Sequence, residues 1–146
     1  MANQIENEVT LRGNKHEIEK FFEECFDEQG NFDFNRVIPQ PKTKNTCPNK
    51  YICDPQEAGI EPCEGREWFD WFSWNYDNWG VKWNAYYCYT DKENNYFEFT
   101  SPWDSPNLIF RALMEKYPNI IFDVDVDGEI DFPYHITYSG KQCKRF

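Results

Sequence analysis

The hydrophobic period changes near the N-terminus, and this change constrains the fold more than any other feature of the sequence. Ile5, Val9 and Leu11 fall on alternate positions of an extended chain with polar residues between them, which predicts a strand. Asn14 is then placed as the N-cap of a helix, with Glu17 three residues later in the pattern of a capping box. The helix is predicted to bury the residues at helical spacing, namely Ile18, Phe21, Phe22, Cys25 and Phe26.

The same change from the alternation of a strand to the spacing of a helix recurs further along the chain. Residues 85–90 and 96–100 are rich in Tyr and Phe and predict a hairpin. Ser105 as N-cap and Pro106 at the first helical position predict another helix, which Pro118 ends.

Two more strands are predicted, at residues 121–126 and 130–137, with a turn at Asp127 and Gly128. The order of elements predicts a single α+β domain over residues 1–146, a ferredoxin-like split βαβ sandwich with helices on one face of an antiparallel sheet and an extra C-terminal strand. This term names a fold and implies no iron–sulfur cluster.

An irregular insertion interrupts this plan after the first helix, at about residues 32–66, where five of the nine prolines lie. A run of this length without a period is usually functional, metal-bound or mobile. Cys47, Cys53 and Cys63 are candidate zinc ligands there, although they lack the close C-x2-C or C-x4-C spacing of zinc fingers. The residues that could supply a fourth ligand are Cys25, Cys88, Cys143, His16 and His135. Free thiols and no cofactor are the expectation, and a zinc-stabilised structural protein is the alternative.

Five of the six tryptophans are clustered just before the hairpin, and a helix is predicted over about residues 66–78. Trp79 and Trp83 are expected to belong to the core. Trp71 and Trp74 do not share the helical spacing that relates Trp79 to Trp83. They are the candidates for an exposed, partner-binding surface.

The net charge is −11, from 26 acidic and 15 basic residues, so a phosphate backbone would be repelled and a basic protein attracted. The N-terminal residues do not resemble a signal peptide, and no apolar run is long enough to span a bilayer. A cytoplasmic protein with reduced cysteines and no membrane contact is therefore expected.

An acidic stripe is predicted near the C-terminus. Its members are Asp123, Asp125, Asp127, Glu129 and Asp131. The spacing resembles a calcium-binding EF-hand loop, but Tyr134 stands where the bidentate glutamate is needed. A strand whose aspartates face outward explains the same residues, and this stripe could engage a basic partner.

Catalytic motifs are not found. The two histidines do not form a metal-protease arrangement, and no nucleophile elbow or phosphate-binding glycine loop is present, so no enzyme is expected. A second hypothesis is a small-molecule or single-stranded nucleic-acid binder that uses the aromatic residues of the hairpin. These are Tyr86, Tyr87, Tyr89, Tyr96, Phe97 and Phe99.

Three blocks resemble those of a known family. They are FDFNRVIPQP at residues 32–41, DNWGVKWNA at residues 77–85, and the aromatic strand that leads to Trp103 and Pro106. The residues that carry the motif are Phe34, Asn35, Pro39, Asn78, Trp79, Gly80, Lys82, Trp83 and Trp103. The chain is similar in these blocks to the YubB-type ferredoxin-like domain family of phage and plasmid proteins.

The resemblance implies a fold and a mobile-element setting, and it brings no catalytic residue with it. Together with the charge, it leads us to expect an accessory protein that binds and inhibits a basic host protein. An acidic mimic of nucleic acid with a counter-defence role (anti-CRISPR-like) would act in this way.

Overall fold

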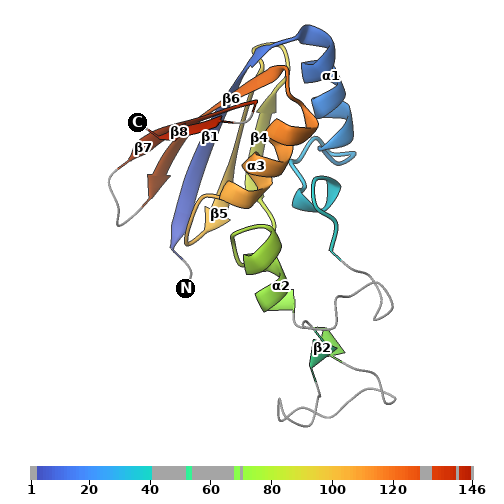
Figure 1. The fold of residues 1–146 in the computed structure, drawn as a ribbon, viewed down its shortest axis with the longest axis vertical. Coiled ribbons are helices and arrows are strands. Elements are labelled where there is room, and N and C mark those ends of the chain that lie inside the picture. The colour runs from blue at the N-terminus through green and yellow to red at the C-terminus, as the bar shows by residue number, and fades with distance from the viewer. Residues whose placement is uncertain are drawn as a thin grey trace.

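The computed structural model describes residues 3–40, 52–53, 68–69, 71–128, 133–140 and 142–145. These residues form an α+β protein, with a six-stranded antiparallel open sheet and three helices packed on it (Figure 1). The helices are α1 (Lys15–Glu24), α2 (Trp71–Asn78) and α3 (Asn107–Lys116), with a short 3-10 helix at Phe34–Arg36. The strands of the sheet are β1 (Gln4–Gly13), β4 (Tyr86–Asp91), β5 (Tyr96–Pro102), β6 (Ile120–Gly128), β7 (Tyr134–Ser139) and β8 (Gln142–Arg145).

The strand order in the sheet is β4-β5-β1-β6-β7-β8, and every neighbouring pair is antiparallel. The N-terminal strand β1 therefore lies in the interior of the sheet, between β5 and β6. One extra C-terminal strand was predicted, and the structure has two, because β8 follows β7. The short polar sequence of β8 carries no apolar alternation, which is why the pattern did not indicate it.

The predictions for β1 and α1 are confirmed. Buried and exposed residues alternate along β1. The Glu17 backbone N–H donates to Asn14 Oδ1 at 3.1 Å and so caps α1. Ile18, Phe21 and Phe22 form the buried face of this helix, as its spacing predicted.

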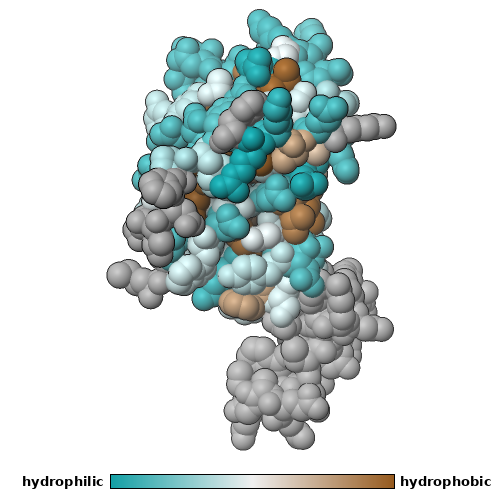
Figure 2. Space-filling model, turned by 60° about the vertical axis from the view of Figure 1, so that its left-hand side comes forward, coloured by the Kyte–Doolittle hydropathy of each residue, from teal (hydrophilic) through white to brown (hydrophobic). Residues whose placement is uncertain are grey.

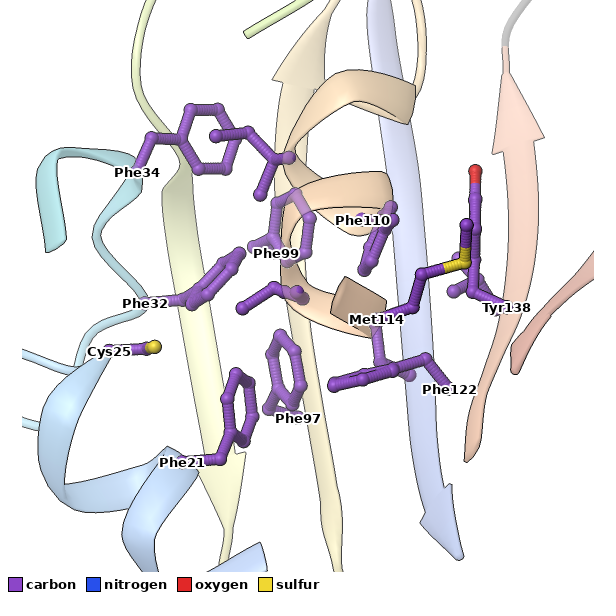
Figure 3. Close-up of a cluster of buried hydrophobic side chains, with 14 of the residues drawn as sticks. Phe21, Cys25, Phe32, Phe34, Phe97, Phe99, Phe110, Met114, Phe122 and Tyr138 are labelled. Atoms are coloured by element: carbon purple, nitrogen blue, oxygen red, sulfur yellow. The ribbon is translucent and has the colours of Figure 1, made fainter. Parts of the chain in front are cut away.

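Aromatic rings fill the space between the helices and the sheet (Figure 3). The Phe21 ring from α1 packs edge-on against Phe122 of β6, with centroids 5.4 Å apart. It also lies 5.6 Å from the Phe97 ring of β5, so one side chain joins a helix to two non-adjacent strands. Phe110 of α3 stacks on Tyr138 of β7 at 5.1 Å, which ties the C-terminal strands to the same core.

The tryptophan-rich stretch differs from its prediction at its start. Trp68–Phe69 is not helical but forms β3, which pairs with β2 at Ile52–Cys53 in a separate two-stranded sheet. Helix α2 begins only at Trp71 and is eight residues long.

The prediction that Trp74 is exposed is wrong. Only 4% of Trp74 is exposed, because α2 packs inward through Trp74 and Asn75. The Trp74 ring meets the buried Trp79 ring edge-on at 5.5 Å, and Trp79 Nε1–H donates to the Ile38 carbonyl at 2.8 Å. Trp83, predicted to belong to the core, is only half-buried. Trp71 is 45% exposed, as predicted.

Helix α3 also begins differently from its prediction. Pro106 occupies the N-cap position, and no side chain caps the helix. The Ser105 hydroxyl instead donates to Asn7 Oδ1 at 2.6 Å, and Asn7 Nδ2 donates to Ser101 Oγ at 2.9 Å. This buried polar network satisfies an asparagine that β1 places on its core side.

Candidate protein-binding face

The sheet has two unlike faces. Phe97, Val124 and their neighbours lie on the side that α1 and α3 cover (Figure 1), whereas the alternate residues of the same strands point to the other side. We call the carboxylates of that other side the acidic face. Its members are Glu6, Glu8, Glu98, Asp123, Asp125 and Asp127. Hydrophilic residues also predominate on the side of the molecule that Figure 2 shows.

The strand register places the carboxylates of the acidic face directly opposite one another. Glu8 of β1 pairs with Glu98 of β5 on one side and with Asp125 of β6 on the other. Tyr89 of β4 faces Glu98, and His135 of β7 faces Asp125, so one row crosses five strands. Like charges that face each other across a sheet destabilise it, and this row therefore opposes folding.

The environment of Glu8 reflects this crowding. Partial burial raises the pKa of its carboxyl above the ordinary glutamate value, and the negative charges of Glu98 and Asp125 raise it further. In the part of the chain that the structure describes, no hydrogen bond or ion pair reaches the Glu8 carboxylate. A cation bound from outside would relieve this repulsion.

A hydrogen-bond network surrounds Asp123 at the edge of the acidic face. Arg12 Nε–H donates to Asp123 Oδ2 at 2.6 Å, and the Thr137 hydroxyl donates to Oδ1 at 2.8 Å. Partial burial alone would raise the pKa of Asp123, but these hydrogen bonds outweigh burial and hold that pKa below its usual range. His135 Nδ1 lies 2.8 Å from Asp125 Oδ1, and the ring therefore neutralises part of one end of the row when it is protonated.

Two open grooves cross the acidic face, and both are lined by Glu6 and Glu8. The first has a volume of about 240 Å³ and extends between Glu98 and Tyr87. The second has a volume of about 380 Å³ and extends toward Asp127, Tyr134 and His135. The carboxylates of β1 are thus accessible from both sides.

The structure brings together part of the predicted acidic stripe. Asp123, Asp125 and Asp127 lie on β6 and face away from the core, which confirms a strand here and is incompatible with an EF-hand loop. The turn predicted at Asp127 and Gly128 is wrong, because both residues continue β6 and pair with β1. Glu129 and Asp131 lie outside the described residues. Trp71 is not part of the acidic face, because it belongs to α2 and not to the strands that carry these carboxylates.

Sequence reasoning missed Glu6, Glu8 and Glu98. The alternation that predicted β1 already directs Glu6 and Glu8 away from the core. The predicted ferredoxin-like plan already implies that β1 pairs with β6, but the alternation within each strand does not fix the register of that pairing. Only that pairing joins the glutamates of β1 to the aspartates of β6.

Most residues of the resemblance motif have structural roles. Phe34 and Trp79 are buried and pack edge-on at 5.5 Å. Gly80 has a φ of +84°, which permits the turn after α2. The remaining motif residues surround this core or lie at its margin. Asn35 accepts a hydrogen bond from the Gln40 N–H, and Asn78 donates to the Trp74 carbonyl. Lys82 lies over the rings of Trp83 and Phe72, whereas Pro39 and Trp103 are exposed.

The zinc hypothesis falls largely on residues that the structure does not describe. Cys47 and Cys63 lie outside them, and of Cys53 only the backbone in β2 is described. Cys25, Cys88 and Cys143 are free thiols. Nowhere in the described ranges do three His, Cys, Asp or Glu side chains converge on a position that could hold a metal ion.

Comparison with protein-family models, with curated proteins and with solved structures finds no match to this chain. The described helices include none that is long and apolar enough to cross a membrane. The fold and the acidic face together define an α+β protein with an accessible, carboxylate-rich sheet surface.

Proposed function

We propose that this chain is a non-enzymatic binding protein whose acidic face occupies the basic surface of a host protein that handles nucleic acid. The observation that carries the proposal is the position of Glu8 between Glu98 and Asp125. A row of facing carboxylates opposes folding, and a cationic partner would convert this repulsion into attraction. Carboxylates spaced along adjacent strands would then take the place of phosphates on the partner.

The biological setting that we propose is a phage or plasmid, with the chain serving to inhibit a host defence factor. The motif resemblance to the YubB-type family supports this setting. The strand order β4-β5-β1-β6, with α1 after β1 and α3 between β5 and β6, supports a ferredoxin-like core to which β7 and β8 are added.

The test is competition with nucleic acid. The tagged chain is incubated with nuclease-treated bacterial lysate, and any captured protein is challenged with increasing duplex DNA. A partner held by the acidic face should be released by the duplex, whereas a protein that stays bound at saturating DNA would contradict nucleic-acid mimicry.

Matched variants separate the acidic face from net charge. Glu6→Gln, Glu8→Gln and Glu98→Gln combined should abolish capture. The control combines Glu19→Gln, Glu23→Gln and Glu28→Gln, which removes the same charge from exposed positions in and after α1. Equal loss of binding in both variants would show that the overall charge, and not this face, attracts the partner.

A second candidate function, binding of single-stranded nucleic acid or of a small molecule, has one observation in its favour. Tyr87 and Tyr89 are 76% and 55% exposed on the edge strand β4, where they could stack on bases or on a small aromatic ligand. Glu98 opposite Tyr89 would repel the phosphates of a nucleic acid. Titration with oligothymidine while tryptophan and tyrosine fluorescence is recorded should show no quenching if the first proposal is right.

A further inference from the structure

We infer that the groove beside Tyr87 receives an arginine side chain of the partner, an inference that rests on the proposed function. The proposed function requires only a cationic surface. The chemistry of this groove selects between the two cationic side chains that such a surface can offer.

Tyr87 is placed over the acidic face by an irregularity in β4. The register between β4 and β5 shifts between Tyr86 and Tyr89, and Tyr87 within this bulge has a φ of +51°. A bulge re-aims the side chain of the residue it inserts. The result is a highly exposed ring that packs against the Tyr86 ring, with centroids 5.0 Å apart, and forms a wall of the groove.

Three carboxylates form much of the remaining wall, together with Gln4, Asn7, Phe99 and Thr100. Glu6, Glu8 and Glu98 line the groove with Tyr87, and Glu98 accepts a hydrogen bond from the Tyr96 hydroxyl at 2.7 Å. Throughout the described ranges, no cationic side chain pairs with Glu6 or Glu8. Arg12, on the same strand, pairs with Asp123 instead.

A guanidinium group fits both kinds of wall. It is planar and can stack on a tyrosine ring, while its N–H groups donate in parallel to a carboxylate. An ammonium group is a compact, strongly hydrated point charge, which can approach a ring but has no planar fork to stack on it while donating in parallel to a carboxylate. The protein itself contains the stacking half of this arrangement, because Arg145 Cζ lies 3.7 Å from the centre of the Tyr134 ring.

The size of the groove is consistent with a single side chain. Its volume of about 240 Å³ is smaller than the 300–1,000 Å³ typical of sites for drug-sized ligands. Of its two aromatic lining residues only Tyr87 is exposed, because Phe99 is buried, so the groove offers little to a neutral aliphatic residue. A small groove with one exposed aromatic ring and several carboxylates favours an arginine at the tip of a basic loop or strand as its ligand.

The experiment is calorimetric titration of the whole chain with capped octa-arginine and octa-lysine peptides at low ionic strength. We expect the arginine peptide to bind about two- to fivefold more tightly, the range that an exposed cation–π contact provides. Tyr87→Leu should remove this preference while retaining lysine affinity, and Tyr87→Phe should restore it.

Tyr89→Ala is the matched control, because Tyr89 is an exposed tyrosine of the same strand that does not line the groove. Its arginine preference should equal that of the parent. Equal affinity for the two peptides, or a preference that survives Tyr87→Leu, would overturn the arginine site and leave the proposed function standing. Failure of both peptides to bind would overturn the proposed function as well.

Discussion

Glu8 of β1 lies directly opposite Asp125 of β6, so two carboxylates face each other in the middle of the sheet. Glu98 faces Glu8 from the other side. A sheet selected for stability alone would place opposite charges or β-branched residues in these positions. The arrangement therefore exchanges stability for an accessible concentration of negative charge, as binding surfaces often do.

Glu8→Gln is expected to stabilise the fold and to weaken binding of a basic partner. Removing one charge from the row relieves repulsion worth about 0.5 kcal/mol, the middle of the range for facing pairs. Because the pKa of Glu8 is raised in the folded protein, the repulsion is present above that pKa and disappears as the pH falls through it.

Urea unfolding of the parent and of Glu8→Gln, followed from neutral to acidic pH, measures this effect. The variant should be the more stable at pH 7, and the two curves should converge in acid. Glu19→Gln, on the exposed side of α1, should show a smaller difference. A Glu8→Gln protein less stable than the parent at pH 7 would refute the repulsive row.

Asp123 should show the opposite pH dependence. Its pKa is lowered by the hydrogen bonds from Arg12 and Thr137, so its contribution to stability is present above the ordinary aspartate pKa of about 3.9. That contribution is lost as the pH falls through the lower pKa of the folded state.

Comparison of the parent with Asp123→Asn over the same pH series is the measurement. Asp123→Asn should be the less stable protein at pH 7, and the difference should vanish in strong acid. Asp127→Asn, at an exposed position of the same strand for which no such pair is described, is the control and should not be destabilising. A destabilisation by Asp123→Asn that persists unchanged in acid would argue against the ion pair.

The elements that the sequence predicted best are those whose burial follows a regular period. In β1 and α1, Val9 and Phe21 belong to patterns that extend over most of the element, so one face is unambiguous. Helix α2 is too short for such a pattern, and its burial depends on Trp74 fitting beside Trp79. The spacing of residues along the helix does not predict tertiary packing of this kind.

The candidate site was predictable only in part for a similar reason. The outward direction of Asp125 follows from alternation along β6, as does that of Glu8 along β1. Their adjacency depends on strand pairing between residues far apart in the chain. The bulge that exposes Tyr87 has no sequence signal either, because tyrosine is an ordinary strand residue and not one that favours a positive φ.

Trp79 is expected to be the residue of the resemblance motif that contributes most to stability. Its ring is fully buried against Phe34 and Trp74, and its indole N–H donates to the Ile38 carbonyl. Trp79→Ala should lower the free energy of unfolding by about 3–5 kcal/mol, the range for removing a large aromatic side chain from a core.

Chemical denaturation monitored by far-ultraviolet circular dichroism tests this expectation. Trp71→Ala provides the control on α2 and should change stability by no more than about 0.5 kcal/mol, because Trp71 is an exposed residue. Similar losses in the two variants would mean that α2 does not pack as described.

Gly13 is expected to tolerate no side chain, because the end of β1 approaches another part of the chain there. Gly13 has a φ of +126°, and a Cβ atom added to it would lie 2.2 Å from the Asn119 carbonyl oxygen. The Asn14 N–H, one residue further on, donates to that same oxygen at 3.1 Å, so the two backbones cannot separate without breaking this bond. Gly30 also has a positive φ, of +82°, but an added Cβ would have no atom within 4 Å. Gly30→Ala should therefore lose only about 1–2 kcal/mol from backbone strain, and Gly13→Ala clearly more, as measured by the urea midpoint of each variant. Equal losses would show that strain alone, and not the contact with Asn119, requires glycine at the end of β1.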